Sequence, residues 1–171
     1  MAARPNPHQL VAVDSNVAYD LNDAREFAVD AIELIRRRLN PVDIVAPLAV
    51  QQELGYIARF ADSEREREAA RQATRALARH RIGPQNLQPV QLGIAGRVAE
   101  RLLAAGLLPV TEENDAHIFV EAAVGGCTML ITSDGHLRHA DFARLTFELN
   151  NFDLNAPVIA TPREILRKFF R

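Results

Sequence analysis

Short apolar runs alternate along the chain with longer stretches in which apolar residues have helical spacing. The short runs are almost wholly apolar and end in polar or turn residues, which is typical of strands that are covered on both faces. They predict five strands, at residues 9–14, 43–47, 107–110, 128–132 and 157–161. Apolar residues that recur every three or four positions predict helices at residues 23–39, 47–60, 90–105 and 114–124, joined by a mostly polar helix at 62–81 and a last helix from Pro162.

The ends of these helices carry recognisable signals. Asp23 is a plausible N-cap for the first helix, and Pro41 ends it. Gly83-Pro84 breaks the polar helix, and Gly106 has the position of a C-terminal stop. Strands that alternate with helices predict an α/β fold, with a mostly parallel five-stranded central sheet and helices on both faces. Neither a repeat nor a linker divides the sequence, so we expect residues 1–171 to form a single domain.

Composition narrows the class of protein. A chain of 171 residues can bury roughly 70% of its unfolded surface and needs no disulfide. The single cysteine, Cys127, lies in an apolar stretch, and its count excludes a zinc site built from several cysteines. The sequence shows neither a signal peptide nor an apolar run of about 18 residues, so we expect a cytoplasmic protein without a membrane span. The net charge of −2 does not indicate a nucleic-acid-binding protein.

Four acidic residues stand at similar places in the predicted fold. Asp14 ends the first strand, and Asp134 comes two residues after the fourth. Asp115 lies in the first turn of the helix after the third strand, and Glu53 lies about two turns into the helix after the second. All can reach the edge of the sheet where ligands bind in α/β folds. Because clustered carboxylates repel one another, this arrangement predicts a divalent cation, and hard oxygen ligands favour Mg²⁺ or Mn²⁺.

Each acid also has an ordinary structural explanation. An Asp after a strand is often a turn former or a helix N-cap, and a lone Glu on a helix is commonly a solvated position. Glu112 and Glu113 could replace Asp115 as a ligand, and Asp141 is a weaker alternative to Asp134. His117 could approach the site, whereas His136 and His139 are expected to be exposed loop residues.

The ordered segments resemble those of PIN-domain nucleases over nearly the whole chain. VAVDSNV is similar to their opening strand, VAPLAVQQEL to their second element, NDAHIFVEAAVGGCTMLITSDGHL to their third and fourth acidic segments, and PVIATPREIL to their closing strand and helix. The resemblance implies a PIN-like three-layer α/β/α fold and hydrolysis of RNA phosphodiester bonds with Mg²⁺ or Mn²⁺, which leaves a 5′-phosphate and a 3′-hydroxyl. It implies that Asp14, Glu53, Asp115 and Asp134 hold the metal and are catalytic, and that Asn16 and Ser133 orient them or their waters.

The resemblance also implies partners. RNA would be the substrate, and a VapC-like toxin would have an antitoxin protein and could form a homodimer. The main alternative is a non-catalytic PIN-like module that binds RNA or protein. A phosphatase fits less well because DSN lacks the second Asp of a DxD motif, and a dinucleotide-binding domain would need a G-x-G-x-x-G after the first strand.

Residues 62–92 depart from the smaller members of the family as an added helical segment. Arginines recur there at every fourth position and drift slowly around one helix face. Arg71, Arg75 and Arg79 could follow nucleic-acid phosphates. They could equally form a solvated face, since the spacings Glu64–Arg67 and Glu68–Arg71 permit internal pairing, or they could dock an acidic protein.

Overall fold

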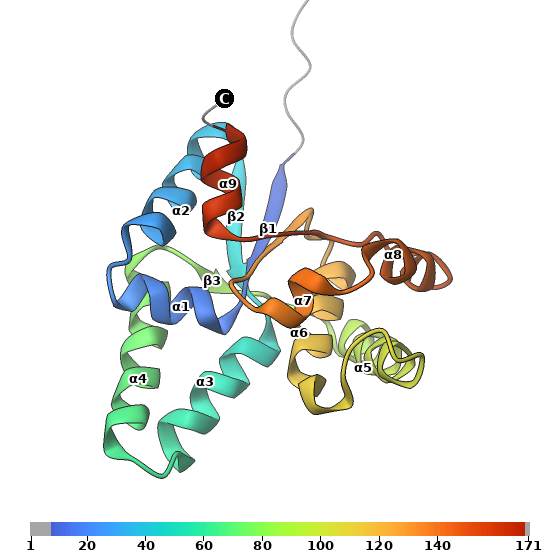
Figure 1. Ribbon diagram of the computed structural model, residues 1–171, viewed down its shortest axis with the longest axis horizontal. Coiled ribbons are helices and arrows are strands. Elements are labelled where there is room, and N and C mark those ends of the chain that lie inside the picture. Colours follow the sequence, from blue (N-terminus) through green and yellow to red (C-terminus); the bar gives the residue numbers. More distant parts are fainter. Residues whose placement is uncertain (1–7, 170–171) are drawn as a thin grey trace, which may run out of the picture.

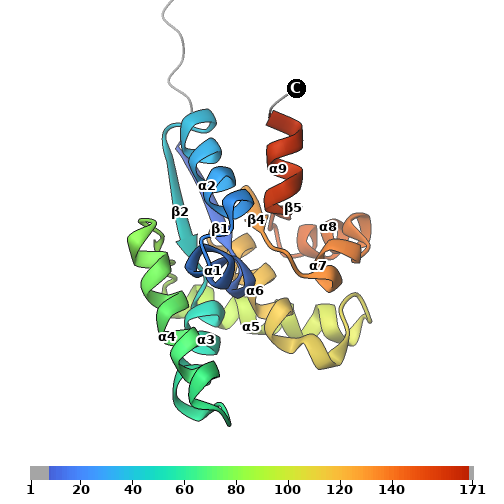
Figure 2. The ribbon, with the colours of Figure 1, turned by 60° about the vertical axis from the view of Figure 1, so that its left-hand side comes forward.

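A computed structural model describes residues 8–169 and shows a five-stranded sheet in the order β3-β2-β1-β4-β5. Each pair of neighbouring strands is parallel, and β1 lies at the centre (Figures 1 and 2). The strands are β1 (Gln9–Val13), β2 (Val42–Ala46), β3 (Gly83–Pro84), β4 (Met129–Ile131) and β5 (Val158–Ala160). The predicted α/β class and parallel sheet are therefore confirmed.

Helices fill the connections between these strands. They are α1 (Ser15–Asn22), α2 (Glu26–Arg38), α3 (Leu48–Phe60), α4 (Glu64–Arg79), α5 (Pro89–Ala104), α6 (Glu113–Val124), α7 (Gly135–His139), α8 (Phe142–Asn150) and α9 (Pro162–Phe169), with a 3-10 turn η1 at Val110–Glu112. No helix among the described residues is long and apolar enough to cross a membrane.

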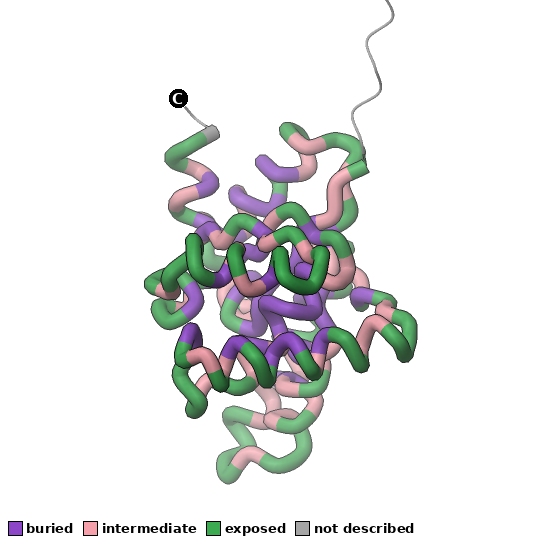
Figure 3. Tube along the Cα trace, turned by 90° about the vertical axis from the view of Figure 1, so that its right-hand side faces the viewer, coloured by how far each residue is buried: buried purple, intermediate pink, exposed green. Residues whose placement is uncertain are grey.

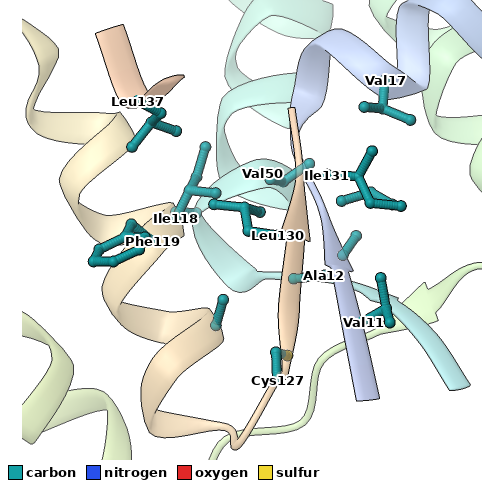
Figure 4. Close-up of a cluster of buried hydrophobic side chains, with 14 of the residues drawn as sticks. Val11, Ala12, Val17, Val50, Ile118, Phe119, Cys127, Leu130, Ile131 and Leu137 are labelled. Atoms are coloured by element: carbon teal, nitrogen blue, oxygen red, sulfur yellow. The ribbon is translucent and has the colours of Figure 1, made fainter. Parts of the chain in front are cut away.

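The helices form a layer on each side of the sheet. On one side, α2 contacts α1 and α9; on the other, α5 contacts α6 and α8. Figure 4 shows Leu130 of β4 pointing toward Ile118 and Phe119 of α6, whereas Ile131 lies on the opposite side with Val17 of α1. All five side chains are fully buried, in the purple interior of Figure 3. This is the predicted three-layer α/β/α arrangement.

The third predicted strand, at residues 107–110, is wrong. Leu107 and Leu108 are buried, but they close the C-terminal end of α5 and pair with no strand. Gly106 has φ +66°, and the Leu107 amide donates to the Leu102 carbonyl at 3.1 Å. This is the hydrogen bond of a Schellman motif, in which an apolar residue follows the glycine and packs back on the helix. The apolar run LLPV therefore follows the C-terminal cap of α5 and packs against that helix instead of forming a strand.

Gly83-Pro84, which was predicted only to break a helix, forms the short edge strand β3. Proline is tolerated there because an edge strand leaves one side without a ladder partner. The Gln85 amide donates to the Ala46 carbonyl at 2.8 Å and extends the pairing with β2. The preceding helix ends earlier than predicted, at Arg79.

Three short helices were not predicted, namely α1, α7 and α8. Helix α1 begins directly after β1, and Asp23 caps its C-terminal end. The predicted role of Asp23 as N-cap of the next helix is therefore wrong, since α2 begins at Glu26 and Arg25 precedes it without a side-chain cap.

Candidate active site

Asp14 lies at the centre of the sheet edge, directly after β1. Its backbone amide donates to the Ile131 carbonyl at 2.9 Å, which places it beside the end of β4 at the point where strand order reverses. The carboxylate is only 1% exposed and caps α1 by accepting from the Ser15 amide at 2.6 Å. Thr132 donates its hydroxyl to the other oxygen, Oδ2, at 2.6 Å. Burial raises the pKa of Asp14 above its ordinary value, although these hydrogen bonds oppose the shift.

Thr132 also orients the loop that carries Asp134. Its Oγ1 accepts from the Asp134 amide at 2.9 Å, so one hydroxyl bridges the side chain of Asp14 and the backbone of Asp134. Asp134 is half-buried and is the N-cap of α7, where its Oδ1 accepts from the His136 amide at 2.6 Å. The helix cap predicted as an alternative reading for Asp134 is thus present, and it leaves the second carboxylate oxygen of Asp134 available for other partners.

Asp115 lies in the first turn of α6, close enough to the other acids for their charges to change its pKa. Its pKa is raised to about 7, chiefly by burial and then by the negative charges of Asp134, Asp14, Glu112 and Glu53. Its Oδ2 atom is buried and has no hydrogen-bond partner among the described residues. A buried carboxylate oxygen without a donor costs free energy, and a cation would remove that cost.

Glu53 reaches the same region from α3. Its Oε2 accepts from the side-chain amide of Asn114 at 2.7 Å, which joins α3 to the first turn of α6. Its pKa is raised, chiefly by burial and then by the charges of Asp14 and Asp134, while hydrogen bonds from Ser15 and Asn114 oppose the shift. The structure therefore brings the four predicted acids into one electrostatic cluster.

The two predicted polar residues have different positions. Asn16 donates from Nδ2 to Asp14 Oδ2 at 3.3 Å, so it contacts the acid cluster. Ser133 is exposed, and its hydroxyl donates to Asp20 Oδ2 at 3.3 Å. Sequence reasoning missed Thr132, Ser15 and Asn114, and only the polar end of the strand TMLIT gave a signal for Thr132.

A second grouping of donors overlaps this cluster. Three potential ligand atoms, one from each of Glu112, Asp115 and His136, lie within 4.8 Å of one another. Nδ1 of His136 is 3.4 Å from Glu112 Oε1 and 3.6 Å from Asp134 Oδ1. Glu112, predicted as a substitute for Asp115, therefore lies beside it, and His136 borders the site from α7. The donor set of carboxylates, with the unpartnered Asp115 Oδ2, fits a hard divalent cation.

Three arginines of α4 form ion pairs with glutamates of the same helix, namely Arg67, Arg71 and Arg75. Arg71 donates to Glu68 at 2.7 Å and to Glu64, and Arg75 is 3.7 Å from Glu68. Arg71 also donates to the Ala58 carbonyl at 3.2 Å, which ties α4 to α3. A nucleic-acid contact by Arg71, Arg75 and Arg79 stays a prediction, and any such contact by Arg71 would compete with these pairs.

Comparisons with known proteins identify the family and the fold. The family model described as PIN domain matches residues 11–143. The fold is similar to a chain in the crystal structure of VapBC2 from Rickettsia felis bound to a DNA fragment from their promoter, with a TM-score of 0.61 and 16% identity. That match covers 90% of this chain and 98% of the other. No curated protein matches the sequence.

Proposed function

The chain belongs to the PIN-domain family, and from that premise we propose that it is a ribonuclease that hydrolyses RNA phosphodiester bonds with Mg²⁺ or Mn²⁺. The observation that carries the proposal is the electrostatic coupling of Asp14, Glu53, Asp115 and Asp134 at one edge of the sheet. Such a cluster lowers stability without a cation, so it is poorly explained by a purely structural role.

Asp14, Glu53, Asp115 and Asp134 are the proposed metal ligands and catalytic residues. A bound divalent ion would activate a water and neutralise charge on the phosphate. Thr132 and Ser15 hold the Asp14 carboxylate in place, and Asn16 donates to the same group. Asn114 positions Glu53. For Ser133 we propose an orienting role at the border of the site, since its hydroxyl donates to Asp20 and to none of the four acids.

Cleavage of RNA by purified protein tests this proposal. Wild type should cleave in Mg²⁺ or Mn²⁺ and lose activity in EDTA, and Asp14→Asn and Asp115→Asn should each reduce the rate at least 100-fold. Asp153→Asn is the matched control, because Asp153 is an exposed aspartate with φ +56° in a turn after α8 and asparagine tolerates that backbone. Equal rates for wild type and Asp115→Asn would refute the assignment and favour a non-catalytic binding module.

We further propose that the nuclease acts as the toxin of a toxin–antitoxin pair, in the cytoplasm. The supporting observation is the fold it shares with a chain of the VapBC2 complex. Expression of wild type alone should arrest growth, and Asp14→Asn should relieve the arrest at equal protein level. Homodimer formation is part of the same proposal, and sedimentation of the purified chain measures it.

A further inference from the structure

A basic pocket lies next to the acid cluster and has no part in it. It has a volume of about 370 Å³ and is lined by α1, α2, the β4–α7 loop, α7 and one face of α9. Three arginines line it: Arg138 of α7, and Arg163 and Arg167 of α9. Figure 1 shows α9 beside α2, with which it is in contact.

Two of the arginines are held in place by neighbouring side chains. The Cζ atom of Arg163 lies over the Phe27 ring, 4.3 Å from its centroid, in a cation–π contact that uses none of its N–H groups as hydrogen-bond donors to another side chain. Arg138 donates to Glu164 Oε1 from Nη2 at 2.7 Å and from Nε at 3.2 Å. Glu164 is itself fixed, because it accepts from the Thr161 amide at 3.0 Å. Ordered guanidinium groups lose little entropy when they bind an anion.

Arg167 lies one turn beyond Arg163 on α9, so both project from one face. Among the described residues, no carboxylate forms an ion pair with Arg163 or Arg167. Asp20 is the acid of the lining, and it accepts from Ser133 at 3.3 Å. Asp20 offsets part of the charge on α9, because the Arg163 charge acts on its carboxyl. With Arg138 paired to Glu164, two arginines against one acid leave the pocket with a net positive charge.

The pocket and the acid cluster are adjacent through one short loop. Ser133 lines the pocket, while its neighbours Thr132 and Asp134 belong to the cluster. Consecutive Cα atoms are about 3.8 Å apart, so the backbone of the pocket lining and that of the cluster meet within one residue of each other. Guanidinium groups bind phosphate oxygens in bidentate geometry.

We propose that Arg163 and Arg167 bind a backbone phosphate of RNA next to the phosphate that is cleaved. The proposal rests on the proposed function, because it needs a nucleic-acid strand at the acid cluster. It assigns substrate binding to α9, at the C-terminal end of the chain, and it gives Asp20 the opposite effect, since its charge repels the same phosphate.

Binding of a fluorescein-labelled mixed-sequence RNA, measured by anisotropy in EDTA, tests the proposal without catalysis. Arg163→Gln/Arg167→Gln should raise Kd about tenfold. The slope of log affinity against log salt concentration should become less steep by about 0.7 for each charge removed. Arg163→Lys/Arg167→Lys should keep the salt dependence of wild type but bind less tightly, because an ammonium group keeps the charge without the bidentate contact. Asp20→Asn should lower Kd severalfold. Arg97→Gln, an exposed arginine on α5, is the matched control and should leave Kd within twofold of wild type.

Circular dichroism first establishes that each variant is folded. An unchanged Kd in the double Gln variant, or an equal loss in Arg97→Gln, would overturn the proposal. Binding of inorganic phosphate by wild type, with RNA affinity independent of the two arginines, would identify a free-anion pocket and also overturn it. Metal-dependent cleavage by wild type is measured in parallel, so that the inference can fail while the nuclease assignment stands.

Discussion

At the scale of single residues, the acid cluster is unfavourable to folding until a cation neutralises it. Asp115 shows this most clearly, since its pKa is about 7 in the folded protein against an ordinary value of 3.8. The unfolded chain loses this proton near pH 4, whereas the folded protein retains it until about pH 7. The free energy of unfolding of the metal-free protein should therefore fall as pH rises from about 4 to about 7.

Asp115→Asn should remove that penalty. At pH 8 in EDTA we expect the variant to be more stable than wild type by about 2 kcal/mol, after discounting the full shift for partial solvent screening. At pH 4 the two proteins should have similar stability, because the aspartate is then protonated. Urea denaturation at both pH values measures the difference. A variant less stable than wild type at pH 8 would contradict the account.

Thr132 makes a second prediction, because its hydroxyl joins Asp14 to the loop of Asp134. Thr132→Val keeps the shape of the buried side chain and removes both hydrogen bonds. Residues that orient metal ligands typically change metal affinity by about 10- to 100-fold. We expect at least a tenfold loss of Mn²⁺ affinity by calorimetry, with Thr132→Ser close to wild type. Equal affinity in all three proteins would show that Thr132 does not orient the site.

At the scale of elements, a buried glutamate fixes the helix that carries Glu53. Helix α3 begins after Pro47 and lacks a side-chain cap from its own N-cap residue. Glu121 of α6 supplies one, since its Oε2 accepts from the Ala49 amide at 2.9 Å. Glu121 is 5% exposed, and burial raises its pKa. The hydrogen bond from the Ala49 amide opposes that shift. This contact sets α3 against α6, which carry Glu53 and Asp115.

Glu121→Ala should uncap α3 and leave a buried amide without an acceptor. We expect a loss of about 2 kcal/mol in the free energy of unfolding, with a smaller loss for Glu121→Gln, whose amide oxygen can still accept. Thermal and urea denaturation measure both. A change below about 0.5 kcal/mol in Glu121→Ala would mean that water replaces the cap.

The sequence predicted those elements whose pattern is long or whose ends are marked. Strands β1, β2, β4 and β5 and helices α3, α5, α6 and α9 follow from apolar runs and helical spacing. The sequence-based prediction was wrong where contacts between distant segments determine the secondary structure. LLPV is apolar because it packs on a helix end. Strand β3 forms because Gly83-Pro84 lies beside β2. Helix α1 is as short as α9, but no proline marks its first turn as Pro162 marks that of α9, so its spacing alone was not diagnostic. Motif order located the four acids, whereas Thr132 and Asn114 become visible only through contacts between distant segments.

At the scale of the whole molecule, the strand order explains why distant acids meet. Asp14 follows the central strand β1, and Thr132 and Asp134 follow its neighbour β4, so the two loops share one edge. Helices α3 and α6 bring Glu53 and Asp115 to that edge. The two helices are joined there by the hydrogen bond from Asn114 to Glu53. The basic pocket extends the edge toward α9. We propose that the chain is a single domain, which predicts one cooperative unfolding transition.

Diffraction from a crystal soaked in Mn²⁺ tests the central claim most directly, because anomalous scattering locates the ion independently of activity. The account predicts an anomalous peak ligated by carboxylates of the cluster formed by Asp14, Glu53, Asp115 and Asp134, and its loss in Asp115→Asn. A site held only by Glu112 and His136, or no peak at the cluster at saturating Mn²⁺, would contradict the account.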